Sequence, residues 1–191
     1  ISSNHYHHWA FAGDIVENGF QSEYDSLTDD LEKVTKVDNF VMCAGNHDIR
    51  IRDYEQSTRR YFDFTNNLNP KDKAIDNIWF EYEVDGYSFL VIGSDEMRFE
   101  DAYLSDAQLE WLEERVAAIS ASGKPVFVMG HYPLRDTHGL PLTWGASLWE
   151  SGTIGDQSDI VYELLNKYDN VFYITGHLHT GIGQYTYEEI G

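Results

Sequence analysis

Short apolar runs alternate with segments of helical periodicity along most of this chain, and the alternation predicts its elements. Four apolar runs have the length of buried strands: 9–12, 39–44, 125–130 and 170–176. Three segments with apolar residues on one side are predicted to be helices: 22–37, 53–64 and 159–168. The alternating segment 183–190 is predicted to be a final strand.

Two further signals fix a hairpin and a helix start. Asp85-Gly86 lies between two apolar segments, 79–84 and 87–93, and is typical of a tight two-residue hairpin. Ser105 followed by Gln108 predicts a capping box at the start of a helix over 105–119. Five apolar residues recur there at helical spacing and are expected to face a core: Leu104, Leu109, Leu112, Val116 and Ile119.

Strand–helix alternation with one internal hairpin predicts an α/β fold with either one mixed sheet or two packed sheets. No repeat, low-complexity stretch or linker divides the sequence, so we expect residues 1–191 to belong to a single domain. The stretch 132–157 is long and lacks a regular pattern, as functional lids and flexible segments do.

Composition restricts the class of partner. The chain has 191 residues, 42% of them apolar, which is enough for one globular domain with a substantial core. Its net charge of −20 disfavours long nucleic acid and anionic membranes as main partners, although a simple solubility bias also explains it. No run approaches the roughly 18 apolar residues of a membrane span. The single Cys43 excludes a disulfide within the chain, and we expect a buried, unreactive thiol.

Four predicted strands end in the same way, with a glycine followed by a polar residue that could bind a metal. The residues at these ends are Gly13-Asp14, Gly45-Asn46-His47-Asp48, Gly130-His131 and Gly176-His177-Leu178-His179. Glycine allows a sharp turn, and ligands gather at the carboxyl ends of strands in α/β proteins. One such end would be an ordinary satisfied polar group, but four together predict a site of oxygen and nitrogen ligands suited to manganese, iron or zinc.

The ordered motifs Gly-Asp, Gly-Asn-His-Asp, Gly-His and Gly-His-x-His resemble those of the calcineurin-like metallophosphoesterases. The resemblance extends from Trp9 to His179, which is nearly the whole chain. It implies a four-layer α-β-β-α sandwich of two mixed sheets, with two metal ions (manganese, iron or zinc) at the carboxyl ends of the strands.

The resemblance also assigns the metal ligands. By position in the motifs, Asp14 would bridge both ions. Asn46, His131 and His177 would complete the coordination of the second ion, and His179 would bind the first. A bridging role requires a carboxylate, because its two oxygens can each reach one ion.

By the same resemblance, His47 and Asp48 would be catalytic rather than metal-binding. A metal-bridging hydroxide would attack the phosphorus of a small phosphoester in line. His47 would stabilise or protonate the leaving oxygen, since an imidazole can donate a proton near neutral pH, and Asp48 would orient His47 from behind. The implied function is metal-dependent phosphoester hydrolysis by a phosphodiesterase or small-molecule phosphatase.

One motif of the family has no counterpart. The family begins with Asp-x-His on a strand upstream of Gly-Asp, and the residues before Gly13 contain none. We therefore expect the first strand and helix, and some C-terminal strands, to lie outside this sequence. Without them the first ion keeps only Asp14 and His179, which leaves a non-catalytic or single-metal scaffold as the alternative. Three nearby histidines are expected to enter the strand before Gly13 rather than to replace the motif: His5, His7 and His8.

Other differences from the family motifs indicate which branch of the family this sequence resembles. Glu17-Asn18 stands where protein Ser/Thr phosphatases place Asp-Arg, and where purple acid phosphatases place a tyrosine at position 17. The Gly-Asn-His-Asp, Gly-His-Tyr-Pro and Gly-His-Leu-His strings look more like the cyclic-nucleotide and general phosphodiesterases. In the long loop after His131, three residues could form an apolar wall for a base or lipid tail, or simply pack the loop: His138, Trp144 and Trp149.

Overall fold

The chain forms a mixed α/β structure with two sheets, described by a computed structural model for residues 7–34, 37–51, 53–137 and 152–179. The first sheet pairs two parallel strands, β1 (His8–Ala12) and β2 (Asn39–Cys43). The second has the order β3-β4-β5-β6. Its strands are β3 (Phe80–Val84), β4 (Tyr87–Val91), β5 (Val126–Met129) and β6 (Val171–Ile174). The β3–β4 pair is antiparallel and the other two pairs are parallel, so the second sheet is mixed.

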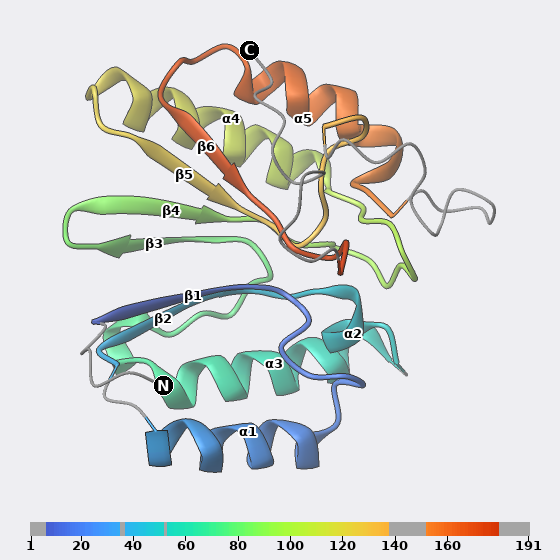
Figure 1. Cartoon of the computed structure of the whole chain (residues 1–191). Helices are drawn as coiled ribbons and strands as arrows, with labels where there is room; N and C mark the ends of the chain where they lie inside the picture. The colour runs from blue at the N-terminus through green and yellow to red at the C-terminus, as the bar shows by residue number, and fades with distance from the viewer. Residues whose placement is uncertain (1–6, 35–36, 52, 138–151, 180–191) are drawn as a thin grey trace.

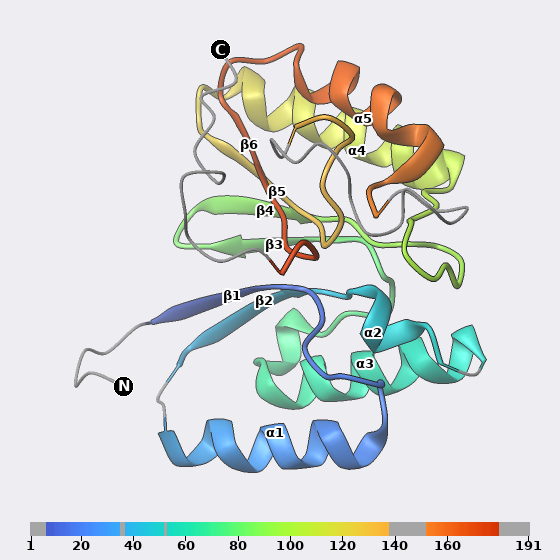
Figure 2. The same ribbon diagram turned by 45° about the vertical axis from the view of Figure 1, so that its right-hand side comes forward.

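The helices lie on the outer sides of the two sheets (Figures 1 and 2). On the first sheet these are α1 (Gln21–Val34) and α3 (Tyr54–Leu68), and on the second they are α4 (Asp106–Ala121) and α5 (Ser158–Leu165). The short helix α2 (Asn46–Ile49) follows β2 directly, and two 3-10 turns, η1 (Lys71–Lys73) and η3 (Gly155–Gln157), lie in connections. The α/β fold with two sheets is thus present, and the second sheet is mixed. Among the described residues the first sheet contains the parallel pair β1 and β2.

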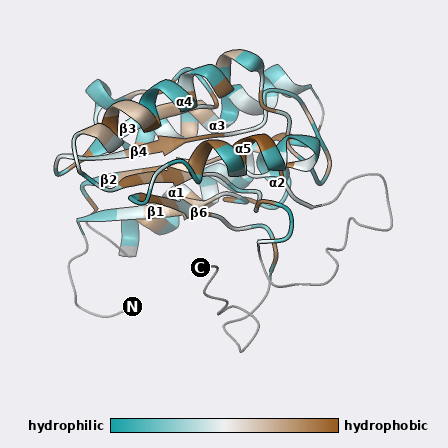
Figure 3. Cartoon of the chain, turned by 90° about the horizontal axis from the view of Figure 1, so that it is seen from above, coloured by the Kyte–Doolittle hydropathy of each residue, from teal (hydrophilic) through white to brown (hydrophobic). Residues whose placement is uncertain are grey.

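Three apolar clusters hold these elements together, and β2 contributes to two of them. Phe40 and Met42 point toward α1 and α3, whereas Val41 and Cys43 point toward the second sheet, as alternation along a strand requires. The cluster between the sheets also contains Tyr82, Val84, Val91 and Met129. The third cluster joins the second sheet to α4 and α5 through residues such as Leu90, Leu112, Val116, Val128 and Val161. Figure 3 shows the apolar residues concentrated on the strands.

Cys43 lies in the cluster between the sheets and is 0% exposed. Its Sγ is 3.6 Å from the Phe11 carbonyl oxygen. Burial raises the pKa of this thiol far above its usual range, so it stays protonated. The expectation of a buried cysteine is confirmed.

The predicted hairpin forms at Asp85 and Gly86, which have φ values of 51° and 79°, as the favoured two-residue hairpin turn requires. All predicted strands and helices that fall on described residues are present, with ends shifted by a few residues. The helix predicted to reach 168 ends at Leu165, where the backbone leaves the helix in a turn whose Tyr168 N–H donates to the Leu165 carbonyl. The strand predicted over 183–190 lies outside the described residues.

The capping box at α4 is half correct. The Ser105 hydroxyl accepts from the Gln108 N–H at 3.3 Å, as predicted. However, the Gln108 side chain is fully buried and donates to the Gly93 carbonyl at 2.9 Å and to Asp95 at 2.7 Å. The Ser105 N–H donates to Asp95 instead, at 2.8 Å. The carboxylate of Asp95 therefore takes the part expected of Gln108, which leaves Gln108 to tie α4 to the end of β4.

Candidate metal centre

Four strand ends, separated widely in sequence, bring predicted ligands together around His131. Its Nε2 lies 3.1 Å from Asp14 Oδ2, 3.2 Å from Asn46 Oδ1 and 3.1 Å from His177 Nδ1. One ligand atom from each of Asp14, His131 and His177 lies within 4.8 Å of the others. The structure thus brings four of the five predicted ligands to one place: Asp14, Asn46, His131 and His177.

The contacts of His131 indicate which tautomer its neutral ring adopts. Its Nδ1 lies 2.7 Å from the Ala12 carbonyl oxygen, which can only accept a hydrogen bond. The proton of the neutral ring therefore sits on Nδ1, and Nε2 presents a lone pair to the oxygens of Asp14 and Asn46. Asp14 Oδ2 is buried and has no hydrogen-bond donor among the described residues. Lone pairs of His131, Asp14 and Asn46 that point at one another with no proton between them are the arrangement expected of metal ligands.

His177 is neutral in this setting. Burial, followed by the neighbouring His131, lowers the pKa of His177 to about 3. A neutral imidazole is the form that coordinates a metal, and His177 directs Nδ1 toward His131 Nε2. Its ring is therefore prepared for coordination through Nδ1.

Two glycines make this convergence possible. Gly13 has φ +85°, and a Cβ there would lie 2.6 Å from His131 Cγ. A Cβ on Gly45 would contact the Asp14 carboxylate. A side chain at either position would displace a predicted ligand, which explains why glycine follows these two strands.

Several residues at the site also have strained, left-handed backbone conformations. Five non-glycine residues of the described chain have positive φ, and three of them are predicted ligands: Asp14 (49°), His177 (71°) and His179 (44°). Such conformations are typical of positions where a functional side chain must be aimed. Strain here is thus associated with ligand placement rather than with ordinary turns.

His179 stands at the open side of the cluster. Its Nε2 is 3.9 Å from Asp14 Oδ2, and its side chain is 69% exposed. It reaches the same Asp14 oxygen as His131, from a more open position.

His47 is the second residue of the one-turn helix α2, beside the cluster. Its backbone N–H donates to Asp14 Oδ1 at 3.0 Å. The ring Nδ1 lies 2.7 Å from the Glu17 carbonyl oxygen, and an Arg50 guanidinium nitrogen lies 2.9 Å from the same Nδ1. This one nitrogen can donate to the Glu17 carbonyl in one tautomer or accept from Arg50 in the other.

Asp48 does not lie behind His47 as expected, and this expectation is corrected. Its carboxylate accepts from the Gly45 N–H at 2.8 Å, from the Ile15 and Val16 N–H groups at 3.3 Å each, and from the Tyr24 hydroxyl at 3.1 Å. Adjacent residues on a helix do not face each other, so Asp48 points away from His47. Its carboxylate fixes the loop that carries Asp14.

Sequence reasoning missed two charged residues at the site. Arg50 follows His47 by three positions, and helical spacing could have indicated their contact. Glu100 lies 54 positions after Asn46, yet its Oε2 is 3.5 Å from Asn46 Nδ2 and 3.6 Å from His177 Nε2. No local pattern marks Glu100, because only the fold brings it there.

Two histidines near the start of the chain, His7 and His8, do not join the centre. His7 contacts Asp38 at 2.8 Å, and His8 contacts Asp85 at 3.1 Å, both at the opposite end of β1 from Asp14. They lead into the strand, as expected. His5, His138, Trp144 and Trp149 lie outside the described residues.

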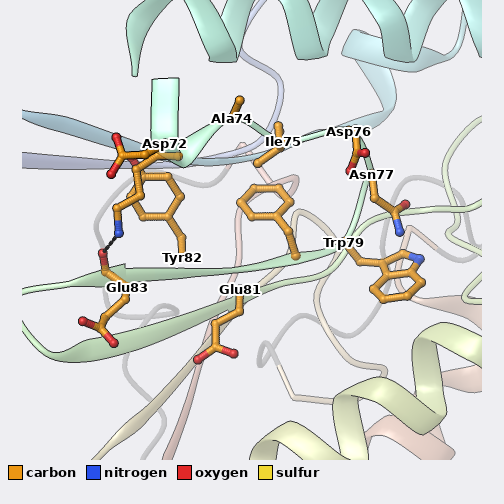
Figure 4. A pocket seen from close by; sticks show the side chains of 11 residues that line it. Asp72, Ala74, Ile75, Asp76, Asn77, Trp79, Glu81, Tyr82 and Glu83 are labelled. Carbon is orange, nitrogen blue, oxygen red and sulfur yellow. Dashed lines mark hydrogen bonds between the residues drawn. The ribbon is translucent and has the colours of Figure 1, made fainter. Parts of the chain in front are cut away.

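A separate pocket of about 540 Å³ lies between β3 and segment 72–77 (Figure 4). Lys73 crosses it to donate to the Glu83 carbonyl at 2.8 Å. None of the predicted site residues lines this pocket. Among the described residues, no helix is long and apolar enough to cross a bilayer.

Comparisons with known proteins agree with this geometry. The sequence profile of the calcineurin-like phosphoesterases matches residues 2–181. A probable cyclic nucleotide phosphodiesterase of Rhodococcus erythropolis is 28% identical over 171 residues, which cover 88% of this chain and 50% of that protein. The chain thus spans about half the length of that curated relative. A crystal structure of a dimetal phosphatase from Danio rerio shares the fold, with a TM-score of 0.59, 14% identity and coverage of 91% and 67% of the two chains. With its motifs at converging strand ends and a profile match over almost its whole length, the chain belongs to the calcineurin-like phosphoesterase family.

Proposed function

We propose that this chain hydrolyses small phosphoesters, phosphodiesters in particular, with the help of bound metal ions. The observation that supports the proposal most directly is that the buried His131 Nε2 lies 3.1 Å from Asp14 Oδ2 and 3.1 Å from His177 Nδ1. The preference for diesters is supported by the name of the Rhodococcus relative and by the form of the four motifs.

The donor set fits metal ions with oxygen and nitrogen ligands, so manganese, iron and zinc are the candidates. Asp14, Asn46, His131 and His177 would hold one ion, and Asp14 with His179 would contribute to a second. When bound, such ions supply Lewis acidity and water of lowered pKa.

The remaining chemistry falls to His47. In the tautomer whose Nδ1 accepts from Arg50, the ring proton lies on the opposite nitrogen, Nε2, which can then donate it. A proton given by Nε2 to the leaving oxygen would neutralise the developing alkoxide. Asp48 acts indirectly, because it holds the loop 13–16 against α2 and so keeps Asp14 in place.

We also propose the four-layer α-β-β-α sandwich for the complete fold, on the support of the three apolar clusters that separate helices from sheets and sheet from sheet. The charge of −20 favours a small substrate over long nucleic acid, since a polyanion would be repelled along its length.

Hydrolysis of bis(p-nitrophenyl) phosphate by the purified protein with added Mn²⁺ tests the proposal. His47→Ala should lower kcat by about 100-fold or more, since general acid catalysis contributes about 10²–10⁴-fold. Asp14→Asn should also lower kcat strongly, because a charged metal ligand becomes neutral. His7→Ala, at the far end of β1, is the matched control and should keep full activity. Full activity in both site variants would contradict the assigned roles.

The competing function is a binding or scaffold protein with a single metal. The tight cluster joins Asp14, His131 and His177, whereas His179 is 69% exposed and 3.9 Å from Asp14, and this difference favours one well-formed metal position. Elemental analysis separates the two: about two ions per chain support the enzyme, and one or none supports the scaffold.

A further inference from the structure

We propose that Glu100 is a positioning residue of the metal centre, whose carboxylate determines which atoms Asn46 and His177 present to the ion. The proposal rests on the metal site of the proposed function. It concerns ligand geometry rather than the reaction, so it can be tested without a substrate.

Glu100 lies in the connection between β4 and α4 and is 9% exposed. A single oxygen, Oε2, lies 3.5 Å from Asn46 Nδ2 and 3.6 Å from His177 Nε2. In both ligands the atom that faces Glu100 is the one not directed at His131. The carboxylate therefore stands behind two predicted ligands at once.

For Asn46 the consequence is the orientation of its amide. The Asn46 Nδ2 group donates to the Phe99 carbonyl at 2.8 Å and lies near Glu100 Oε2. Both neighbours only accept, so they stabilise the orientation with nitrogen outward and oxygen inward. In that orientation Oδ1 lies 3.2 Å from His131 Nε2, and only the oxygen of an amide binds a cation.

For His177 the consequence is the tautomer. A carboxylate beside Nε2 favours the proton on Nε2, which leaves the lone pair on Nδ1, the nitrogen that faces His131. At 3.6 Å the interaction is electrostatic rather than a hydrogen bond. A cation on Nδ1 would draw charge from the ring and strengthen the attraction to Glu100.

The negative charge of Glu100 is itself compensated. An Arg50 guanidinium nitrogen lies 3.8 Å from Glu100 Oε1, and the two side chains are 16% and 11% exposed. A carboxylate this deeply buried is costly without a cationic neighbour. Because Arg50 also contacts His47 Nδ1, one residue connects the carboxylate behind the ligands to the proposed proton donor.

The test measures metal binding by Glu100→Gln. Mn²⁺ titrated by calorimetry should show a Kd about 10–100-fold weaker than in the unaltered protein, the usual effect of removing such an outer carboxylate. Co²⁺ bound in place of Mn²⁺ should give an altered visible absorption spectrum. Glu96→Gln is the matched control, because Glu96 lies in the same connection, has a side chain that is 53% exposed, and pairs with Arg98 at the surface at 3.1 Å.

Denaturation of the metal-free proteins separates positioning from a general structural role. A Glu100→Gln protein that folds but binds Mn²⁺ as tightly as the unaltered protein, with an unchanged Co²⁺ spectrum, overturns the proposal. If Glu100→Gln fails to fold, Glu100→Asp replaces it with the same criterion, since it keeps the charge and withdraws it by one methylene. An unaltered protein that binds Mn²⁺ through His131 without hydrolysing phosphoesters overturns only the proposed function. One that binds no metal overturns both.

Discussion

Replacing Gly13 by alanine tests whether the backbone before Asp14 must approach His131 closely. A left-handed φ of +85° costs a non-glycine residue about 1–2 kcal/mol. The added Cβ would also lie 2.6 Å from His131 Cγ and 2.7 Å from His131 Cβ, and overpacking of this kind costs about 1–3 kcal/mol. We therefore expect Gly13→Ala to lower the free energy of unfolding by about 2–5 kcal/mol in total.

Gly123→Ala isolates the steric part of this effect. Gly123 has a nearly equal φ of +78°, but a Cβ there would meet nothing within 4 Å. Urea denaturation of both variants should show the smaller loss, about 1–2 kcal/mol, for Gly123→Ala. Because the clash moves His131, only Gly13→Ala should also weaken Mn²⁺ binding. Equal losses in the two variants, with Mn²⁺ affinity retained in both, would refute a close contact between Gly13 and His131.

Three other predictions follow from described contacts. Asp48→Asn should destabilise the protein by about 3 kcal/mol in urea denaturation, because the charged acceptor of three backbone N–H groups and one hydroxyl is lost. Tyr24→Phe removes only the hydroxyl donor and should cost about 1.5 kcal/mol. An Asp48→Asn protein of unchanged stability would contradict the role of Asp48 in fixing the loop. Burial alone would raise the pKa of Glu81, but Arg115 at 2.7 Å lowers it. Arg115→Gln should therefore destabilise the protein by under about 1 kcal/mol above about pH 4.3, and this difference should vanish as the pH falls through the lowered pKa of Glu81. A difference that does not depend on pH would contradict the ion pair. Mn²⁺ at one hundred times its Kd should stabilise the protein by about 2.7 kcal/mol, and His131→Ala should remove this gain; an equal gain in that variant would place the metal elsewhere.

Much of the fold could be predicted from the sequence because its signals are local. The Asp85-Gly86 hairpin and the Ser105 cap depend on neighbouring residues, and both are present. The choice between one mixed sheet and two packed sheets was open, because it depends on pairings between distant strands. The apolar residues of β2 on both faces are compatible with either arrangement, and only contacts with Tyr82 and Met129 across the interior distinguish them.

The candidate site divides in the same way. Asp14, Asn46, His131 and His177 could be predicted because each follows a strand end, where topology brings ligands together. The partner of Asp48 could not be predicted from its neighbour in the motif, since side chains one residue apart on a helix diverge.

Glu100 is out of reach of any such argument. It lies in an irregular connection, and only the three-dimensional path of that connection sets it beside Asn46 and His177. Residues behind a site are in general harder to identify from sequence than those that form it.

The position of Cys43 makes it a natural probe of local opening between the two sheets. As the only cysteine in the chain, it would be the sole target of an alkylating reagent, and the reagent can reach it only when the interior seam between the sheets opens. The labelling rate under native conditions therefore counts these openings, without any engineered tag. A metal ion bound by residues at the ends of β2, β5 and β6 should make these openings rarer. Slower labelling of Cys43 would then report that the metal centre is occupied.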